Sequence, residues 1–106
     1  MLNKFNEVLP VSEELVEIPT TYKLFQNFPN PFNPTTTIKY SIPKSGIVSI
    51  KIYNTVGEQV ASLVNKEQEI GNYEIKFDAT FFSSGIYFYQ LKSEDFIETK
   101  KMILIK

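Results

Sequence analysis

Four residue types are missing from this chain of 106 residues: cysteine, histidine, tryptophan and arginine. Without cysteine there is no disulfide framework and no thiol nucleophile, and such a chain suits any redox compartment. Without histidine and cysteine, the usual protein ligands of zinc and copper are absent. Every cation is a lysine, so bidentate phosphate recognition by arginine is absent. The net charge of −1 creates no overall field that would attract nucleic acid or an anionic membrane.

Long apolar runs are also missing. None approaches the roughly 20 residues that a membrane-spanning helix needs. The first residues read MLNKFNEVLPVSEELVEIP, and they place Glu7, Glu13, Glu14 and Glu17 where a signal peptide needs an uninterrupted apolar stretch. We therefore expect no transmembrane segment and no secretory signal in this chain.

The first 21 residues differ in charge from the remainder. They hold one lysine and four glutamates, a net of −3, whereas residues 22–106 hold ten lysines and eight acids, a net of +2. Ser12 could cap a brief helix that ends at Ile18, although Leu15 stands where a capping box needs Glu or Gln. We interpret residues 1–21 as a linker or tail, with a short docked edge strand as the alternative.

From Tyr22 onward the apolar residues recur with a period of two, which is typical of strands with one buried face. Ile86 to Leu91 is instead apolar on nearly both faces, as in a central strand. The expected strands are Tyr22 to Phe25, Ile38 to Ile42, Val48 to Ile52, Val60 to Val64, Tyr73 to Phe77, Ile86 to Leu91 and Lys101 to Lys106.

Turn-forming residues separate these strands. Gly57, which follows Asn54-Thr55-Val56, predicts a type I turn with a left-handed residue closing a hairpin, and Gly85 predicts a sharp turn into the central strand. Seven or so short strands in about 85 residues predict an all-β fold, an antiparallel β-sandwich of immunoglobulin-like kind. A small barrel is the alternative. The expected core residues are Ile38, Tyr40, Ile50, Ile52, Ile75, Phe77 and Leu91.

Three prolines, Pro29, Pro31 and Pro34, fall within six positions just before a strand. Each proline fixes its own φ and biases the residue before it towards extended geometry. Because prolines lack an N–H group, the segment also cannot template strand addition. We expect a rigid corner whose two phenylalanines, Phe28 and Phe32, plug one end of the sandwich.

No arrangement of residues indicates an enzyme. Asp78 and Asp95 are scattered without a partner for acid–base work, and no histidine exists to activate Ser83 or Ser84. Neither a glycine-rich phosphate loop nor an acidic calcium loop is present. We therefore expect no enzymatic activity, no cofactor and no metal site.

Two weaker patterns favour structural interpretations. Asn30-Pro31-Phe32 matches a tripeptide that endocytic adaptors bind in disordered tails, but here it adjoins a folded domain. Tyr53, Tyr87 and Tyr89 could form an exposed aromatic strip for sugars or partners, although buried cross-strand pairing is the commoner use of such residues.

The last residues, KKMILIK, permit two roles. The strand could lock the sheet through Met102 to Ile105, or it could be an address that a receptor reads, since a chain end is accessible. Physical reasoning alone favours the lock.

Four separated strings, in order FPNPFNPTTTIKYSIP, GIVSIKIYNTVGEQV, SSGIYFYQL and TKKMILIK, resemble the type A C-terminal sorting domain of the type IX secretion system of Bacteroidetes and related bacteria. The resemblance covers about residues 22–106. The family is similar in turn to the immunoglobulin-like domain of flagellar hook-capping proteins, which shares the Pro-Asn-Pro-Phe stretch.

The resemblance implies a non-catalytic targeting domain that directs an upstream cargo across the outer membrane. Its implied partners are the type IX machinery, a sortase-like peptidase that removes the domain, and the cargo in cis. It implies no nucleic acid partner, and the cargo would pass through the periplasm to be secreted or attached to lipopolysaccharide at the cell surface. The alternative is a structural or adhesive immunoglobulin-like domain that binds protein or carbohydrate.

Three motifs carry over by position. The proline motif is Pro29, Asn30, Pro31, Phe32, Asn33 and Pro34; the middle motif is Gly57, Glu58, Gln59 and Val60; the terminal motif, to which targeting would fall, is Lys100, Lys101, Met102, Ile103, Leu104, Ile105 and Lys106. There are two departures. Phe82 stands where the family usually has leucine, which affects local packing, and the missing signal peptide and cargo suggest a fragment of a longer precursor.

Overall fold

The computed structural model describes residues 17–106, and within them the chain forms seven strands and no helix. The strands are β1 (Lys23–Leu24), β2 (Thr35–Ile42), β3 (Gly46–Tyr53), β4 (Gln59–Gln68), β5 (Gly71–Asp78), β6 (Gly85–Ser93) and β7 (Phe96–Leu104). Most of the expected tail, and the helix expected from Ser12, lie outside the described residues. No helix in residues 17–106 is long and apolar enough to cross a membrane.

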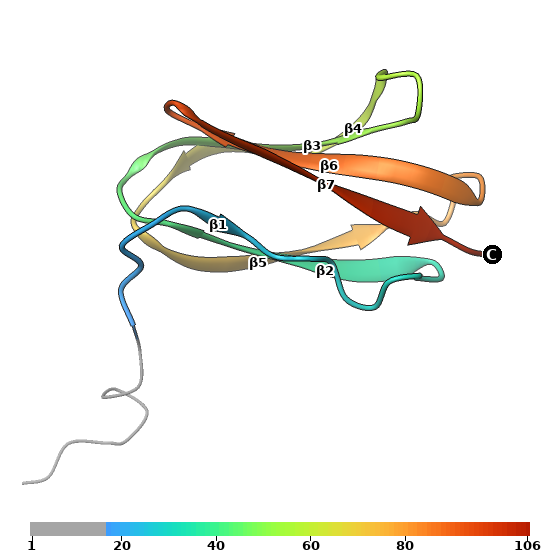
Figure 1. Cartoon of the computed structure of the whole chain (residues 1–106), viewed down its shortest axis with the longest axis horizontal. Coiled ribbons are helices and arrows are strands. Elements are labelled where there is room, and N and C mark those ends of the chain that lie inside the picture. Colours follow the sequence, from blue (N-terminus) through green and yellow to red (C-terminus); the bar gives the residue numbers. More distant parts are fainter. Residues whose placement is uncertain (1–16) are drawn as a thin grey trace, which may run out of the picture.

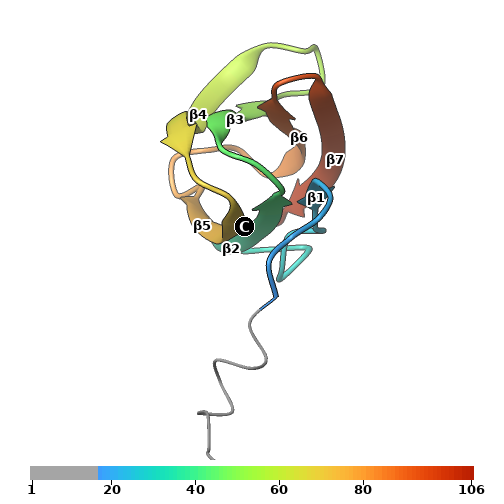
Figure 2. The ribbon, with the colours of Figure 1, turned by 90° about the vertical axis from the view of Figure 1, so that its left-hand side faces the viewer.

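The strands form two sheets that face each other (Figures 1 and 2). One sheet has the order β1-β2-β5 and the other the order β4-β3-β6-β7, and every neighbouring pair is antiparallel. The expected all-β antiparallel sandwich of about seven strands is confirmed, and the small barrel is wrong. In the end view, β7 and β1 lie at one edge of the sandwich and β4 and β5 at the other (Figure 2).

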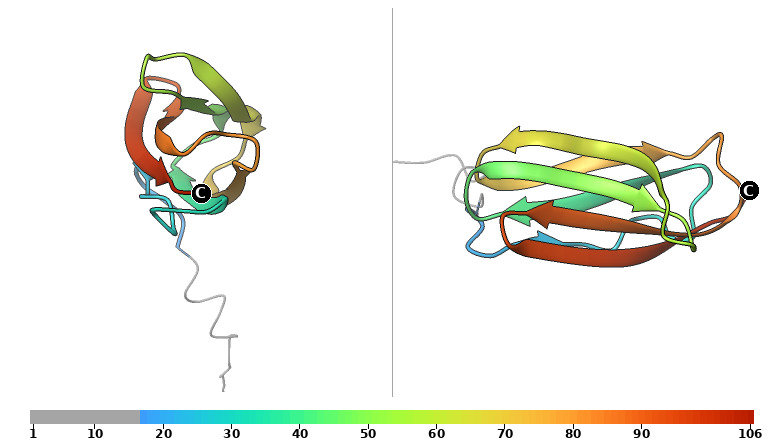
Figure 3. Two further views of the ribbon diagram at one scale, coloured as in Figure 1. Left: turned by 90° about the vertical axis from the view of Figure 1, so that its right-hand side faces the viewer. Right: turned by 90° about the horizontal axis from the view of Figure 1, so that it is seen from above.

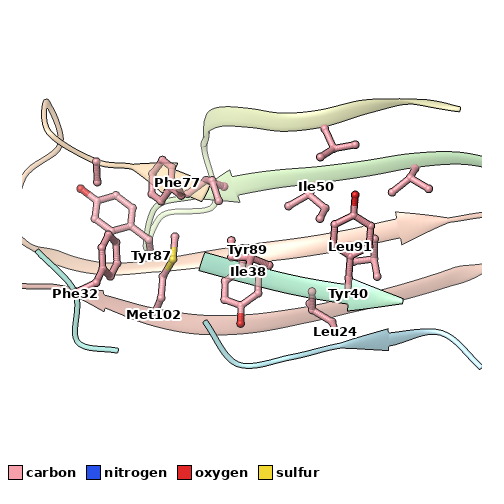
Figure 4. Close-up of a cluster of buried hydrophobic side chains, with 14 of the residues drawn as sticks. Leu24, Phe32, Ile38, Tyr40, Ile50, Phe77, Tyr87, Tyr89, Leu91 and Met102 are labelled. Carbon is pink, nitrogen blue, oxygen red and sulfur yellow. The ribbon is translucent and has the colours of Figure 1, made fainter. Parts of the chain in front are cut away.

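The core forms where the alternating apolar residues of the two sheets meet (Figure 4). Six of the seven expected core residues are buried, and the seventh, Ile75, is only partly buried and packs against the others. Ile75 lies on β5, which has a neighbouring strand on one side alone, so its side chain is covered from fewer directions. β6 lies between β3 and β7, which confirms that Ile86 to Leu91 belongs to a central strand.

All seven strands differ from their expected bounds by at least one residue, and β4 and β7 differ most. β4 runs on to Gln68, and β7 begins at Phe96 and ends at Leu104 instead of covering Lys101 to Lys106. The β6–β7 hairpin is closed by two residues, Glu94 and Asp95, with Ser93 paired to Phe96. Because this turn is tight, residues 97–100 pair with β6 as a strand, although their side chains show no apolar alternation that would indicate one.

The two turn glycines behave as their sequence context indicates. Gly57 has a φ of 86° and its N–H donates to the carbonyl of Asn54 (3.1 Å). The Asn54 Oδ1 atom also accepts from the N–H of Glu58 (2.9 Å), which completes the β3–β4 turn. Gly85 opens β6 with a φ of 151°. Both φ values lie in a region that residues with a Cβ rarely adopt, so substitution at either position would strain the turn.

Candidate recognition site

The terminal motif is partly built into the core. Met102 and Leu104 on β7 are fully buried between the sheets, while Lys101 and Ile105 are exposed. β7 is the last strand of its sheet and pairs with β6 on one side only. Its second backbone edge would therefore offer unpaired N–H and C=O groups to another strand.

The proline motif covers the C-terminal part of that second edge. The N–H of Phe32 donates to the carbonyl of Ile103 (2.9 Å), and the N–H of Ile105 donates to the carbonyl of Phe32 (3.0 Å), so Phe32 forms a parallel bridge to Leu104. The Asn30 Oδ1 atom accepts from the N–H of Ile103 (2.9 Å). Two motifs some seventy residues apart in the sequence are thus brought together as one surface.

Gln26, three residues before the proline motif, adds a further contact. The Gln26 Nε2 atom donates to the carbonyl of Lys101 (2.7 Å) and to the Oδ1 atom of Asn27 (2.7 Å). From Lys101 to Ile105, four backbone groups on this edge have partners in the segment from Gln26 to Phe32. We call these contacts the edge cover.

A buried polar cluster fixes the edge cover to both sheets. The Tyr89 hydroxyl, on β6, accepts from the N–H of Asn27 (2.8 Å) and donates to the carbonyl of Phe25 (2.6 Å). The Asn27 Nδ2 atom donates to Thr36 Oγ1 (3.0 Å) and to the carbonyl of Pro29 (3.2 Å), and Thr36 Oγ1 also donates to Pro29 (2.8 Å). Because each hydrogen-bonding group is paired, the cluster tolerates burial.

Burial raises the pKa of the Tyr89 hydroxyl to about 12, against the opposing effect of its hydrogen bond with the backbone of Asn27. The tyrosine is therefore neutral at physiological pH, as a hydroxyl that both donates and accepts must be. No sequence pattern singled out Gln26, Asn27 or Thr36. Only Tyr89 offered a signal, since an inward-facing tyrosine on a central strand needs a partner for its hydroxyl.

The expectation for the two phenylalanines is half wrong. Phe32 is buried (2% exposed) and lies in an aromatic cluster with Phe77, Phe82 and Tyr87 at one end of the core (Figure 4). Phe28 is 79% exposed. Its backbone pairs with that of Thr37 through two hydrogen bonds (3.0 and 2.9 Å), and residues directly opposite on an antiparallel pair share a face. Thr37 lies between the buried Thr36 and Ile38, so that face points outward.

Phe82 packs edge-on against Phe77 and Tyr87, with ring centroids 5.4 and 5.7 Å apart. Its aromatic ring therefore contributes to the packing at this end of the core. Tyr87 and Tyr89 are buried, whereas Tyr53 is only partly so. The three tyrosines therefore form no continuous exposed strip.

The three terminal lysines do not share one environment. Lys101 is exposed, but Lys100 is partly buried with its Nζ atom 3.4 Å from a carboxylate oxygen of Glu98. Lys106 is exposed yet held in place: its Nζ atom donates to the carbonyls of Thr80 and Phe82 (2.9 Å to Phe82), and its N–H donates to Ser84 Oγ (2.9 Å).

The middle motif lies in the β3–β4 turn and the start of β4, at the same end of the sandwich as the last residue (Figures 1 and 3). No hydrogen bond joins it to the terminal motif within residues 17–106. Of the three motifs, the structure therefore brings together two, the proline motif and the terminal motif.

Ser84 and Asp78 both make local structural contacts. Ser84 accepts a hydrogen bond from the backbone of Lys106 (2.9 Å), and its role is to hold the last residues. The Asp78 carboxylate caps a turn by accepting from the N–H and hydroxyl of Thr80, and these bonds lower its pKa. No group of three or more acidic side chains in residues 17–106 gathers as a metal site would require.

No curated protein matches the chain significantly. A family model, described as the secretion system C-terminal sorting domain, matches residues 26–106. That span contains β2 to β7 and, with Gln26, all of the residues that form the edge cover. The chain belongs to the family of type IX secretion C-terminal sorting domains.

Proposed function

We propose that the edge cover and the exposed side of β7 form a single address that the type IX machinery reads. The observation that carries this proposal is the hydrogen bond from the N–H of Ile103 to Asn30 Oδ1 (2.9 Å). It joins the proline motif to the terminal motif, two of the three motifs that the family resemblance carries over to this chain. A receptor that contacts the terminal strand from this side meets the exposed residues Asn30 and Pro31 as well, so both motifs contribute to recognition.

The test is export of a periplasmic reporter fused ahead of this chain in a type IX–competent host, with reporter measured in the medium. Asn30→Ala removes the acceptor and leaves Ile103 without its partner, whereas Asn30→Asp retains an oxygen at that position. We expect Asn30→Ala to reduce export while the fusion stays folded, and Asn30→Asp to preserve most of it. Equal export by both variants and the unmodified chain would refute the composite address.

A second pair of variants tests the contribution of charge. Lys101 lies on the outward face of β7, and Lys92 lies on the outward face of β6, and both are exposed. Each Lys→Gln change should cost little stability, because exposed charges contribute only about 0–1 kcal/mol. If the address includes the terminal charges, Lys101→Gln lowers export and Lys92→Gln does not. Unaffected export in both would assign recognition to the backbone and the apolar side chains.

The sorting role also defines what we propose for the rest of the precursor. Residues 22–106 act as the targeting module and residues 1–21 join it to a cargo that reaches the medium or the cell surface. A sortase-like peptidase removes the module after export. Peptide mapping of the exported reporter tests this step: the loss of all peptides from residues 22–106 supports removal, and their retention on the mature protein would favour an adhesive immunoglobulin-like domain instead.

A further inference from the structure

The outer edge of β5 is self-complementary, and this property does not depend on the sorting role. β5 pairs with β2 alone, over the uninterrupted register Thr35↔Asp78 to Ile42↔Gly71. Figures 2 and 3 show β5 at the border of its sheet, on the side away from β1. Among the edges of the described sheets, β1 has only two residues, β7 carries the edge cover, and β4 is interrupted by two register shifts.

The hydrogen bonds identify which backbone groups of β5 face outward. Thr37 exchanges both of its bonds with Phe28, so the odd-numbered residues of β2 face β1 and the even-numbered ones face β5. Their partners Phe77, Ile75 and Tyr73 then face β2. The bond from the N–H of Ala79 to the carbonyl of Pro34 (2.8 Å) fits the same alternation. The N–H and C=O groups of Asn72, Glu74, Lys76 and Asp78 therefore face outward, and none has a backbone partner within residues 17–106.

A second copy can pair with this edge about a two-fold axis at Ile75. Antiparallel pairing then places Glu74 opposite Lys76 of the other copy, and Lys76 opposite its Glu74. All four residues have outward backbone groups, as a hydrogen-bonded pair requires. Sliding the partner strand by two residues in either direction would instead set glutamate against glutamate or lysine against lysine, which destabilises a sheet pair. The charges thus select one register.

The inward side chains are symmetric about the same point. Ile75 meets its own copy, and Tyr73 meets Phe77. Tyr73 and Ile75 are only partly buried in the single chain, so a partner strand would cover apolar surface that β2 leaves open. We propose that this chain forms a two-fold dimer through its β5 edges, which joins the two three-stranded sheets into one sheet of six strands. An interface of a single strand pair lies at the small end of specific interfaces, so a dissociation constant in the micromolar to millimolar range is expected.

Sedimentation velocity of the full 106-residue chain over a wide concentration range tests the dimer. We expect Glu74→Lys and Lys76→Glu each to weaken self-association by at least about tenfold, since each turns two attractive cross-strand pairs into repulsive ones. An equimolar mixture of the two variants should associate again, because every pair is then attractive. Lys92→Glu, which changes the net charge as Lys76→Glu does but lies in the other sheet, serves as the control and should associate like the unmodified chain.

Cross-linking tests the position of the axis and does not depend on the charge variants. Since the chain lacks cysteine, Ile75→Cys supplies the one thiol, and two such positions facing each other in a non-hydrogen-bonded pair lie within reach of a disulfide. We expect mild oxidation to produce a covalent dimer from Ile75→Cys and none from Ile97→Cys, which is also accessible (55% exposed). The proposal would be overturned if the chain sedimented as a monomer at all concentrations up to about 1 mM. A dissociation constant of that size corresponds to a binding free energy of only about 4 kcal/mol. A variant mixture that fails to associate, or equal cross-linking at both cysteine positions, would do the same.

Discussion

Tyr89→Phe should destabilise the domain more than the removal of any other tyrosine hydroxyl. The substitution keeps the ring, so the apolar burial of this fully buried residue is unchanged. It removes the acceptor of the N–H of Asn27 (2.8 Å) and the donor to the carbonyl of Phe25 (2.6 Å). Asn27 is itself buried, and water cannot replace the lost partner without opening the edge cover.

The magnitude follows from what is left unpaired. A buried group without a partner costs about 1–3 kcal/mol, and the loss of a partly accessible hydrogen bond about 0.5–1.5 kcal/mol. We therefore expect the free energy of unfolding to fall by about 2–4 kcal/mol. In a domain whose total is about 5–15 kcal/mol, this corresponds to a melting temperature lower by about 10–25 °C. Because the chain has no tryptophan, urea unfolding is best followed by far-ultraviolet circular dichroism.

Two other tyrosines provide matched controls. The Tyr87 hydroxyl donates one hydrogen bond, to the carbonyl of Ser83 (2.7 Å), so Tyr87→Phe should cost about 1 kcal/mol. The Tyr22 hydroxyl is buried with no partner in residues 17–106, while its ring stacks on Phe96. Tyr22→Phe should therefore leave stability unchanged or raise it. If Tyr89→Phe cost no more than Tyr87→Phe, the polar cluster would not be what fixes the edge cover.

The remaining predictions concern the core, alkaline pH and metals. Ile50→Ala should lower the free energy of unfolding in urea by roughly 2–5 kcal/mol, because the side chain is fully buried and its removal leaves a cavity. The control Ile97→Ala should change stability by less than about 0.5 kcal/mol. A similarly small loss for Ile50→Ala would show that Ile50 does not belong to the core. The pKa of Tyr89 is about 12 in the folded state and about 10 in the unfolded state, so the folded state holds this proton more tightly. The free energy of unfolding is therefore unaffected below pH 10 and declines as the pH rises towards 12. Tyr89→Phe should reduce this decline in stability. Part of the decline should remain, because burial also raises the pKa of Tyr40. An unchanged slope of stability against pH would contradict the role of Tyr89. Finally, the purified chain should show no hydrolase activity and retain no zinc after dialysis, and stoichiometric zinc by elemental analysis would overturn this.

The strands and most of the core could be predicted because their signal is local. Period-two alternation at Ile38 and Tyr40, or at Ile50 and Ile52, depends only on one face being buried. The start of β7 at Phe96 could not be predicted in this way, since residues 97–100 pair through a tight turn and their side chains carry no period. Ile75 was expected in the core because its spacing matches that of Phe77, but spacing does not distinguish an edge strand from a central one.

The separate parts of the candidate recognition site could be predicted from the sequence, but the way in which they assemble could not. The sequence indicated the rigidity of the proline motif and the importance of the last strand, yet nothing in either segment specifies the other as its partner. Asn30, Gln26 and Asn27 are polar side chains that can bond to any nearby backbone, so their partners Ile103, Lys101 and Tyr89 become known only from the fold. The fates of Phe28 and Phe32 diverged for the same reason, because each depends on which strand its backbone meets.

The edge cover also bears on the two roles considered for the terminal motif, which are to stabilise the sheet and to act as a sorting signal. The two roles were posed as alternatives, but Met102 and Leu104 fill the core while Lys101 and Ile105 lie outside it on the same strand. Deleting residues 102–106 would remove core contacts, the bonds to Asn30 and Phe32, and the ties from Lys106 to Thr80, Phe82 and Ser84. A loss of export after such a deletion would follow from unfolding as readily as from a missing address. Only substitutions that spare the core can separate the two roles. Lys101→Gln and Asn30→Ala do so, because the first leaves every buried contact in place and the second removes one hydrogen bond, worth about 1 kcal/mol, at an exposed position.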